Sequence, residues 1–218
     1  MYRPASIIFG IFTALACITL VYCQRMGWVE AAATAKFIAS TGFLATAVSA
    51  GALRHGFGRI IFAGLLLSMA GDMFLVGQTQ RHFLFGLASF LLAHIAYTTA
   101  FVQRGQERRQ ALLAAIPIVV VAVLVLAWLR PHLEPPIELP VQVYVAAISL
   151  MVITAFGARG AGAPRLVVIG AVLFFVSDLA VAMQRIVAPG FPAYLWGLPL
   201  YYSGQLCLAL GASHSSSQ

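Results

Sequence analysis

The chain has 218 residues, of which 61% are hydrophobic and only 9% are charged, and its formal net charge is +7 at pH 7. Soluble domains have about a quarter of their residues charged, so this composition excludes a soluble globular protein and indicates a polytopic membrane protein. The positive charges are Arg residues scattered over short loops, so we expect no nucleic-acid partner.

Eight segments are long and apolar enough to cross a bilayer, which takes about 20 mostly apolar residues. They are residues 5–23, 31–52, 59–77, 83–102, 111–129, 141–158, 165–185 and 194–212. We therefore expect an all-α fold of about eight transmembrane helices, with residues 1–212 forming a single transmembrane domain. The first segment lacks a clear small-residue cleavage site, so we interpret it as a helix and not as a signal peptide. Residues 213–218 are expected to be a polar, disordered cytoplasmic tail.

The Arg residues between these segments predict the orientation in the membrane. With an even number of spans, the side that holds both termini carries Arg3, Arg54, Arg59, Arg104, Arg108, Arg109, Arg159 and Arg165. The opposite side carries Arg25, Arg81, Arg130 and Arg185. Since cytoplasmic loops are enriched in Arg and Lys, we expect a multi-pass protein with both termini in the cytoplasm. The abundance of Arg over Lys and of Ala is typical of a high-GC bacterial gene, which indicates the bacterial inner membrane.

The longest connection lies between the fifth and sixth segments. It runs from Arg130 to Pro140 and contains Pro131, Pro135 and Pro136 as well as Pro140. Because proline disfavours the interior of a helix, we expect an extended connector here.

Two aspartates lie deep inside these apolar segments. Asp72 is in the third and Asp178 is in the seventh, each about 13 residues beyond a cytoplasmic Arg. A carboxylate at the centre of a bilayer costs about 2.5 kcal/mol or more, so such a residue usually has a partner or a function. The flanking sequences, Leu67–Leu75 and Leu173–Val181, are similar to each other, which predicts two parallel four-helix halves with a site between them.

Other polar residues within the spans are candidates to lie near these carboxylates and form a site with them. They are Lys36, His94, Tyr97, Tyr144, Tyr201 and Gln205. His94 and Tyr97 are three residues apart and therefore share a helix face. Lys36 either extends to the membrane surface or reaches inward to a carboxylate. Each of these residues can also be purely structural, as a hydrogen-bond partner between helices.

Two carboxylates in a cavity of low dielectric constant can differ in protonation at neutral pH, one acting as an acid and the other as a base. The same pair suits proton relay in a transporter, so the residues alone leave both functions open. No short His and Glu spacing typical of a metal site is present, so we expect neither a metal nor another cofactor.

Several short motifs resemble the YhhN-type membrane proteins, the family that includes the lysoplasmalogenases. They are Gly71–Leu75, Phe85–Tyr97, Ser177–Leu179 and Tyr201–Gln205, together with Lys36, Tyr144 and Met151. Their order and spacing extend over nearly the whole chain. The resemblance implies an eight-helix membrane hydrolase whose substrate is a lysophospholipid with a vinyl ether chain, and whose products are a fatty aldehyde and a glycerophospho-headgroup.

On this resemblance, Asp72 and Asp178 are expected to form the acid/base pair, with their roles unassigned. His94, Tyr97, Tyr201 and Gln205 are expected to position water and the glycerol hydroxyl, and Lys36 to hold the phosphate or tune an aspartate. Tyr144 is a further candidate for substrate positioning. The alternatives from other classes are a proton-coupled small-molecule or lipid transporter and a non-catalytic structural or regulatory membrane protein.

Overall fold

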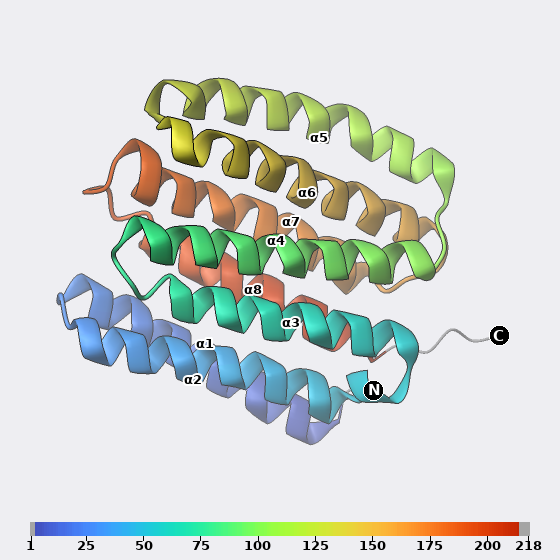
Figure 1. Cartoon of the computed structure of the whole chain (residues 1–218). Coiled ribbons are helices and arrows are strands. Elements are labelled where there is room, and N and C mark those ends of the chain that lie inside the picture. The colour runs from blue at the N-terminus through green and yellow to red at the C-terminus, as the bar shows by residue number, and fades with distance from the viewer. Residues whose placement is uncertain (1–2, 214–218) are drawn as a thin grey trace.

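A computed structural model describes residues 3–213, and eight long α-helices run through them (Figure 1). These are α1 (Pro4–Arg25), α2 (Val29–Ala50), α3 (Gly56–Phe74), α4 (Gln80–Gln103), α5 (Arg108–Leu129), α6 (Pro135–Gly160), α7 (Arg165–Ala182) and α8 (Tyr194–Gly211). Short 3₁₀ turns lie at Ala52–Arg54 and Arg130–His132, and a π-helical turn at Met183–Val187 extends α7. Each apolar segment expected from the sequence corresponds to one of these helices, whereas residues 214–218 of the expected tail lie outside the described residues.

The expected extended connector between the fifth and sixth segments is wrong. Residues 130–132 form a 3₁₀ turn, and α6 already begins at Pro135. Proline is tolerated at the first helical position because its missing N–H has no intrahelical partner there. Pro140 lies inside α6, so the Pro-rich stretch starts a helix instead of separating two helices.

The ends of several helices follow directly from local sequence. Glu107 precedes α5, and its carboxylate accepts hydrogen bonds from the backbone N–H groups of Arg109 at 2.9 Å and Gln110 at 2.8 Å. At the C-terminal end of α2, Gly51 adopts a φ of 102°, a left-handed conformation that favours glycine. Such caps satisfy backbone groups that have no partner within the helix.

Seven of the eight helices are long and apolar enough to cross a membrane, and α8 is the one that is not. α8 is less apolar because Tyr194, Tyr201, Tyr202 and Gln205 lie on it. The helix nevertheless packs against α7, α2, α1 and α3, so protein surrounds much of its polar surface. A multi-pass membrane protein therefore follows from the helices together, and α8 passes through its interior.

Six helices form a ring in which each helix packs on the next, in the order α2, α3, α4, α6, α7 and α8, and α8 packs again on α2. The remaining two lie outside this ring. α1 packs on α2 and α8, and α5 packs on α6 at the opposite edge of the bundle (Figure 1). The ring thus provides the interior in which a site can form.

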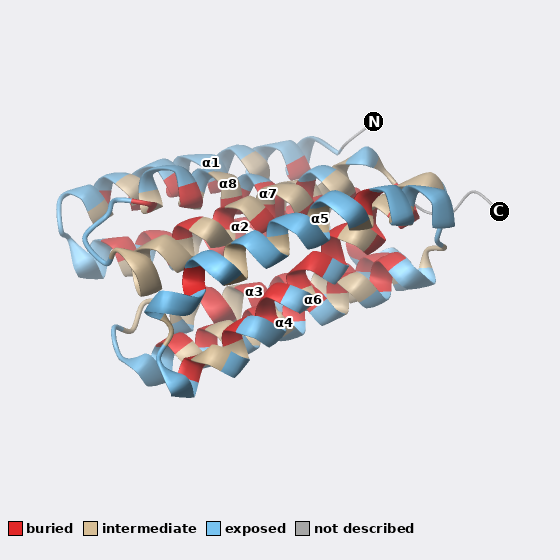
Figure 2. Cartoon of the chain, turned by 90° about the horizontal axis from the view of Figure 1, so that it is seen from above, coloured by how far each residue is buried: buried red, intermediate tan, exposed pale blue. Residues whose placement is uncertain are grey.

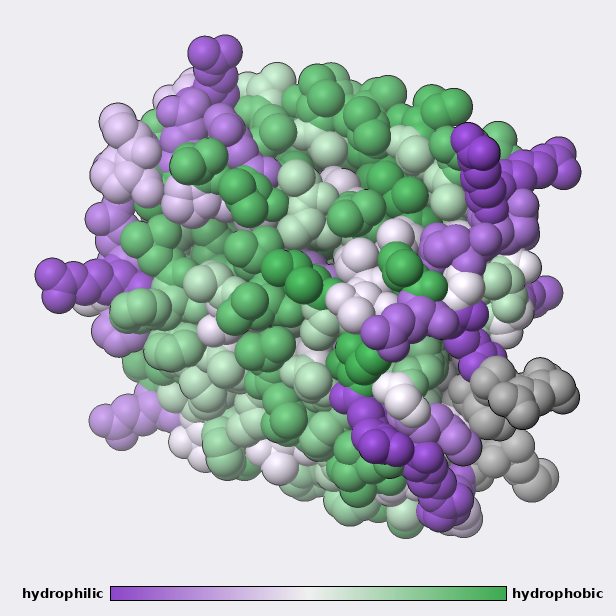
Figure 3. Space-filling model, turned by 45° about the vertical axis from the view of Figure 1, so that its right-hand side comes forward, coloured by the Kyte–Doolittle hydropathy of each residue, from purple (hydrophilic) through white to green (hydrophobic). Residues whose placement is uncertain are grey.

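The outer surface is strongly apolar. Only 11% of the most apolar window of α5 is buried, and α5 is exposed over most of its length (Figure 2). Its outward side chains include Leu112, Ile116, Val120 and Leu124. Hydrophobic residues also cover the middle of the face seen in Figure 3, and hydrophilic residues gather at its two ends. This distribution suits a bundle whose middle is surrounded by lipid chains.

Two glycines allow α7 and α8 to pack closely. A Cβ atom added at Gly170 would lie 2.8 Å from the backbone oxygen of Gly204, and one added at Gly204 would lie 3.0 Å from the backbone oxygen of Gly170. Small residues at such crossings let helix backbones approach one another within a membrane. The position of α8 in the ring depends on this contact.

We predict that Gly170→Ala lowers the stability of the folded protein by roughly 1–3 kcal/mol, because the added methyl group forces the two backbones apart. The matched control is Gly10→Ala, where an added Cβ meets no atom within 4 Å. Thermal unfolding of the two variants in the same detergent provides the measurement. Equal melting temperatures for both variants would contradict the close packing of α7 on α8.

Candidate active site

A cavity of about 590 Å³ lies inside the ring of helices, and both membrane-embedded aspartates line it. Asp72 comes from α3 and Asp178 comes from α7. Lys36 from α2, Tyr144 from α6 and Tyr201 from α8 also line this cavity. The tertiary structure therefore brings together polar groups from five helices that are distant in the sequence.

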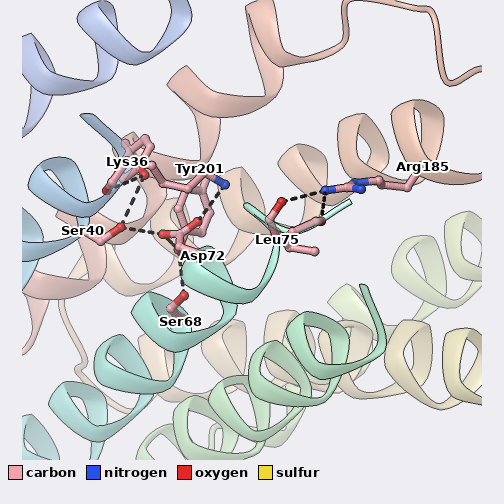
Figure 4. A network of polar contacts seen from close by, with 9 residues as sticks. Lys36, Ser40, Ser68, Asp72, Leu75, Arg185 and Tyr201 are labelled. Carbon is pink, nitrogen blue, oxygen red and sulfur yellow. Dashed lines mark hydrogen bonds and ion pairs between the residues drawn. The ribbon is translucent and has the colours of Figure 1, made fainter. Parts of the chain in front are cut away.

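Asp72 is surrounded by hydrogen-bond donors (Figure 4). Its Oδ2 accepts from the hydroxyl groups of Ser40 at 2.7 Å and Tyr201 at 2.8 Å, and its Oδ1 lies 3.5 Å from the Lys36 ammonium. The Asp72 residue is only 2% exposed. Donors on both oxygens provide the interactions that a buried carboxylate requires.

The helices present these donors through their regular spacing. Lys36 and Ser40 are four residues apart on α2 and therefore lie on one face, which packs toward α3 and α8. The backbone oxygen of Lys36 also accepts a hydrogen bond from Tyr202 at 3.4 Å. This bond ties α8 to the part of α2 that carries the lysine.

Asp178 is held by a second and different set of groups. Its Oδ2 accepts a hydrogen bond of 2.5 Å from the Tyr144 hydroxyl, and that hydroxyl lies 3.0 Å from His94 Nε2. Because the Tyr144 proton is directed to Asp178, His94 Nε2 must donate to the Tyr144 oxygen. His94, Tyr144 and Asp178 thus form a directed chain of hydrogen bonds from α4 through α6 to α7.

Aromatic rings separate the two carboxylate clusters. The Phe174 ring contacts His94 at a centroid distance of 4.8 Å and Tyr201 at 5.3 Å, in both cases edge to face. Phe90 contacts Tyr201 at 5.9 Å and lines the cavity. Since edge-to-face packing restricts ring orientation, these contacts fix the rings of Tyr201, which bonds Asp72, and of His94, which lies beside Asp178.

Each aspartate is contacted from two helices besides its own. Asp72 on α3 accepts hydrogen bonds from Ser40 on α2 and Tyr201 on α8. Asp178 on α7 accepts a hydrogen bond from Tyr144 on α6, and its Oδ2 lies 3.8 Å from His94 Nε2 on α4. The two halves expected from the sequence stay a prediction.

The candidate residues from the sequence occupy two layers. Asp72, Asp178, Lys36, Tyr144 and Tyr201 line the cavity. His94, Tyr97 and Gln205 are absent from the lining and are completely buried behind it. Tyr97 donates to Gln205 Oε1 at 3.0 Å and its hydroxyl lies 3.3 Å from Ser68. His94 contacts the cavity-lining Tyr144. Tyr97 and Gln205 are linked through Ser68, whose backbone oxygen accepts a hydrogen bond from the cavity-lining Tyr201.

Two residues that contact or line the site were not among the candidates from the sequence. Ser40 is four residues from Lys36, and this spacing is the signal that could have identified it. Arg185, interpreted from the sequence only as a loop charge, lines the cavity near its end. It lies seven residues after Asp178, in the π-helical turn that follows α7.

The cavity is lined by polar groups on one side and by apolar groups on another. Gln24, Trp28, Gln78, Gln184 and Arg185 line the end nearest the loops between α1 and α2, α3 and α4, and α7 and α8. Side chains of α4, α5 and α6 line an apolar part, including Leu87, Val125, Leu129, Val141 and Val145. The two aspartates share the cavity with both regions, so an amphipathic molecule fits its chemistry.

Among residues 3–213, no group of three or more His, Cys, Asp and Glu side chains is arranged to hold a metal ion. The reactive groups that this cavity offers are carboxyl, hydroxyl and ammonium groups. Such groups can give and take protons and can stabilise developing charge.

Comparison with known proteins relates most of the chain to one family. The model of the YhhN family matches residues 31–212. No solved structure matches the chain significantly.

Individual relatives include enzymes from animals and bacteria. Lysoplasmalogenase TMEM86A of Bos taurus is 33% identical over 177 residues, which cover 75% of this chain and 72% of that protein. A lysoplasmalogenase of Mycobacterium tuberculosis is 33% identical over 153 residues, covering 66% of this chain and 58% of that protein. Lysoplasmalogenase TMEM86B of Homo sapiens is 29% identical over 160 residues, covering 73% of this chain and 66% of that protein.

The ion pair between Lys36 and Asp72 can be tested by measuring the stability of the folded protein, without an activity assay. We expect Lys36→Met to lower stability by about 3–5 kcal/mol, because it leaves Asp72 buried without its cation. The double variant Lys36→Met with Asp72→Asn removes both charges and should recover much of this loss. A double-mutant cycle of thermal unfolding measures the coupling. Additive effects of the two substitutions would show that the two side chains do not interact.

Proposed function

The chain belongs to the YhhN family, and we propose that it is a membrane-embedded lysoplasmalogenase that hydrolyses the vinyl ether bond of a lysoplasmalogen or a related ether lysolipid. The products are a fatty aldehyde and a glycerophospho-headgroup. The observation that carries this proposal is the presence of Asp72 and Asp178 in one cavity. The relatives described above, all lysoplasmalogenases by name, support the same reaction.

The shape and lining of the cavity support a lysolipid substrate. Its volume of about 590 Å³ falls within the range of about 300–1,000 Å³ that is common for small-molecule sites. The alkenyl chain would lie along the apolar part formed by α4, α5 and α6, and the headgroup would lie at the polar end. The ether bond between them is then placed beside the aspartates.

The reaction requires a proton donor and a group that stabilises positive charge. A proton is added to the alkene carbon distal to the ether oxygen, and the electrons of the double bond form the new C–H bond. The resulting oxocarbenium ion takes up water with loss of one proton and gives a hemiacetal. Collapse of the hemiacetal breaks the C–O bond to glycerol, releases the aldehyde and returns the proton to the alcohol oxygen. The net consumption is one water molecule.

Asp178 is the better candidate for the proton donor. Its Oδ2 is occupied by Tyr144, while within the described residues no hydrogen bond to its Oδ1 is present. Its side chain is 17% exposed, compared with 3% for Asp72. The free oxygen can therefore carry a proton toward a substrate in the cavity. His94 acts behind it as a positioning residue, by fixing the orientation of Tyr144.

Asp72 is the better candidate for the ionised carboxylate. Lys36, Ser40 and Tyr201 all direct donors toward its oxygens, which leaves little room for a proton on the carboxyl group. An anion at this point would stabilise the oxocarbenium ion and orient the attacking water, as the second carboxylate does in glycosidases. Lys36 would then keep Asp72 ionised through their ion pair. The hydrogen bond between Tyr97 and Gln205 would hold α8, which carries Tyr201, against α4.

The orientation in the membrane is also part of the proposal. The polar end of the cavity lies at the end of the bundle that carries Arg25, Arg81, Arg130 and Arg185. By the distribution of Arg residues this end faces away from the cytoplasm, with both termini inside. The enzyme of a bacterial inner membrane would thus take its substrate from, and release its headgroup product to, the outer side.

We predict that Asp72→Asn and Asp178→Asn each lower the rate of aldehyde release by roughly 10²–10⁴-fold, the range typical for loss of a general acid or base. Purified protein is incubated with lysoplasmalogen, and aldehyde is measured over time. The matched control is Glu138→Gln, which removes a partly exposed carboxylate that does not line the cavity. Unchanged rates in both folded aspartate variants would contradict the mechanism, and uptake driven by a pH gradient without aldehyde would support a transporter.

The two aspartate roles can be separated by chemical rescue with a small carboxylic acid such as acetic acid. Activity of Asp178→Ala should be restored by the protonated acid, so rescue increases as the pH falls. Activity of Asp72→Ala should be restored by the carboxylate anion, so rescue increases as the pH rises. The opposite pattern would exchange the assigned roles of the two residues.

A further inference from the structure

Two cationic side chains line the cavity, and they differ in what they contact. Lys36 lies 3.5 Å from the Asp72 carboxylate. Arg185, in contrast, has no carboxylate within 4 Å among the residues that the structure describes. Its positive charge is therefore not neutralised by a neighbouring acid, although it lines the same cavity.

Neutral oxygens hold the Arg185 guanidinium group in place. Its Nη2 donates to the backbone oxygen of Leu75 at 2.7 Å (Figure 4). Nη2 also donates to the backbone oxygen of Gly77 at 3.4 Å, and Nη1 donates to Gln78 Oε1 at 3.4 Å. Leu75 is the C-cap of α3, where helix carbonyls attract a cation. A guanidinium has five N–H donors, so these three bonds leave two donors available.

The backbone at Arg185 is also unusual. Residues Met183–Val187 form a π-helical turn at the end of α7, and such turns are frequent at functional sites. Trp28, Gln78 and Gln184 line the same end of the cavity. The turn thus places a fixed cation among polar groups at the mouth of the cavity.

The spacing between Arg185 and Asp178 matches a glycerophospholipid. Four residues of α7 and three of the π-helical turn separate the two positions, and at the α-helical rise of about 1.5 Å per residue this is at most about 10 Å along the axis. In the proposed substrate, seven bonds connect the alkene carbon that receives the proton to the phosphorus atom. At about 3.8 Å for every three bonds of an extended chain, these bonds extend about 9 Å. One substrate can therefore contact both residues.

We propose that Arg185 binds the phosphate group of the lysolipid headgroup at the mouth of the cavity and thereby determines the preference for phosphate-bearing ether lipids. This inference rests on the proposed lysoplasmalogenase function. A planar guanidinium forms paired hydrogen bonds with phosphate oxygens, and Lys36, already engaged with Asp72, remains with the carboxylate. The headgroup phosphate then anchors the substrate while Asp178 faces its alkene carbon.

The experiment compares two substrates with the same alkenyl chain, a lysoplasmalogen and the corresponding 1-alkenylglycerol, which lacks the phosphate. The measured quantity is the ratio of their kcat/KM values in the full-length protein. We expect Arg185→Gln to lower this ratio about tenfold or more, mainly by raising the KM of the lysoplasmalogen, because a hydrogen bond to a charged group is lost. Arg185→Lys, which keeps the charge, should lower it less.

The matched control is Arg81→Gln, an exposed Arg of the same end of the bundle that does not line the cavity; its ratio should stay unchanged. If Arg185 only fastens α7 to α3, Arg185→Gln and Arg185→Lys would affect both substrates equally, and the inference would be overturned. A wild-type protein that releases aldehyde from neither lipid would instead overturn the proposed function. If the wild-type protein hydrolyses both lipids with equal kcat/KM, the phosphate site would be overturned and the proposed function would stand.

Discussion

The placement of two carboxylates inside an apolar helix bundle is the constraint on which the rest of this structure depends. A charged or polar group without partners is expensive in this environment, so every donor around Asp72 and Asp178 must arrive from a neighbouring helix. Asp72 requires α2 and α8 beside α3, and Asp178 requires α6 and α4 beside α7. Satisfying both carboxylates therefore largely defines which helices form the ring.

The same constraint explains how hydrophobicity is distributed among the helices. α8 contributes Tyr201, Tyr202 and Gln205 to the interior, all three of them buried, and it is the least suited of the long helices to contact lipid. α5 supplies few groups to the interior and is the most hydrophobic of the candidate spans. Helices that carry polar side chains occupy the centre of the bundle, because neighbouring protein groups provide the hydrogen-bond partners that lipid chains lack.

The cavity combines regions of different polarity. Its apolar part suits a hydrocarbon chain and its polar end suits a headgroup, and under the proposed function the aspartates would act on the bond that connects the two. An amphipathic substrate can be aligned by these contrasts before any specific contact with the reacting bond is made. Under the proposed function, binding energy from the chain and the headgroup would position the reacting carbon near the proton donor, as remote contacts do in enzyme catalysis.

The number and approximate ends of the helices, the family and the placement of Asp72 and Asp178 within the helices were accessible from the sequence. Length and apolar composition determine membrane spans directly, and a carboxylate within a span is conspicuous because of its cost. The shared face of His94 and Tyr97 was also predictable from helical spacing, and both side chains are fully buried. The beginning of α6 in a Pro-rich stretch was not predicted, since proline permits a first helical turn as well as a connector.

Other features were decided by tertiary structure. Ser40 looks in the sequence like its neighbour Thr41, yet Thr41 bonds the backbone oxygen of Phe37 in its own helix, while Ser40 donates to Asp72. Likewise, His94 and Tyr97 lie on one face but bond to different helices, Tyr144 on α6 and Gln205 on α8. Helical periodicity specifies which side chains point inward, because it is a property of one helix. Which inward groups meet depends on the packing of all the helices, and only the folded bundle establishes that.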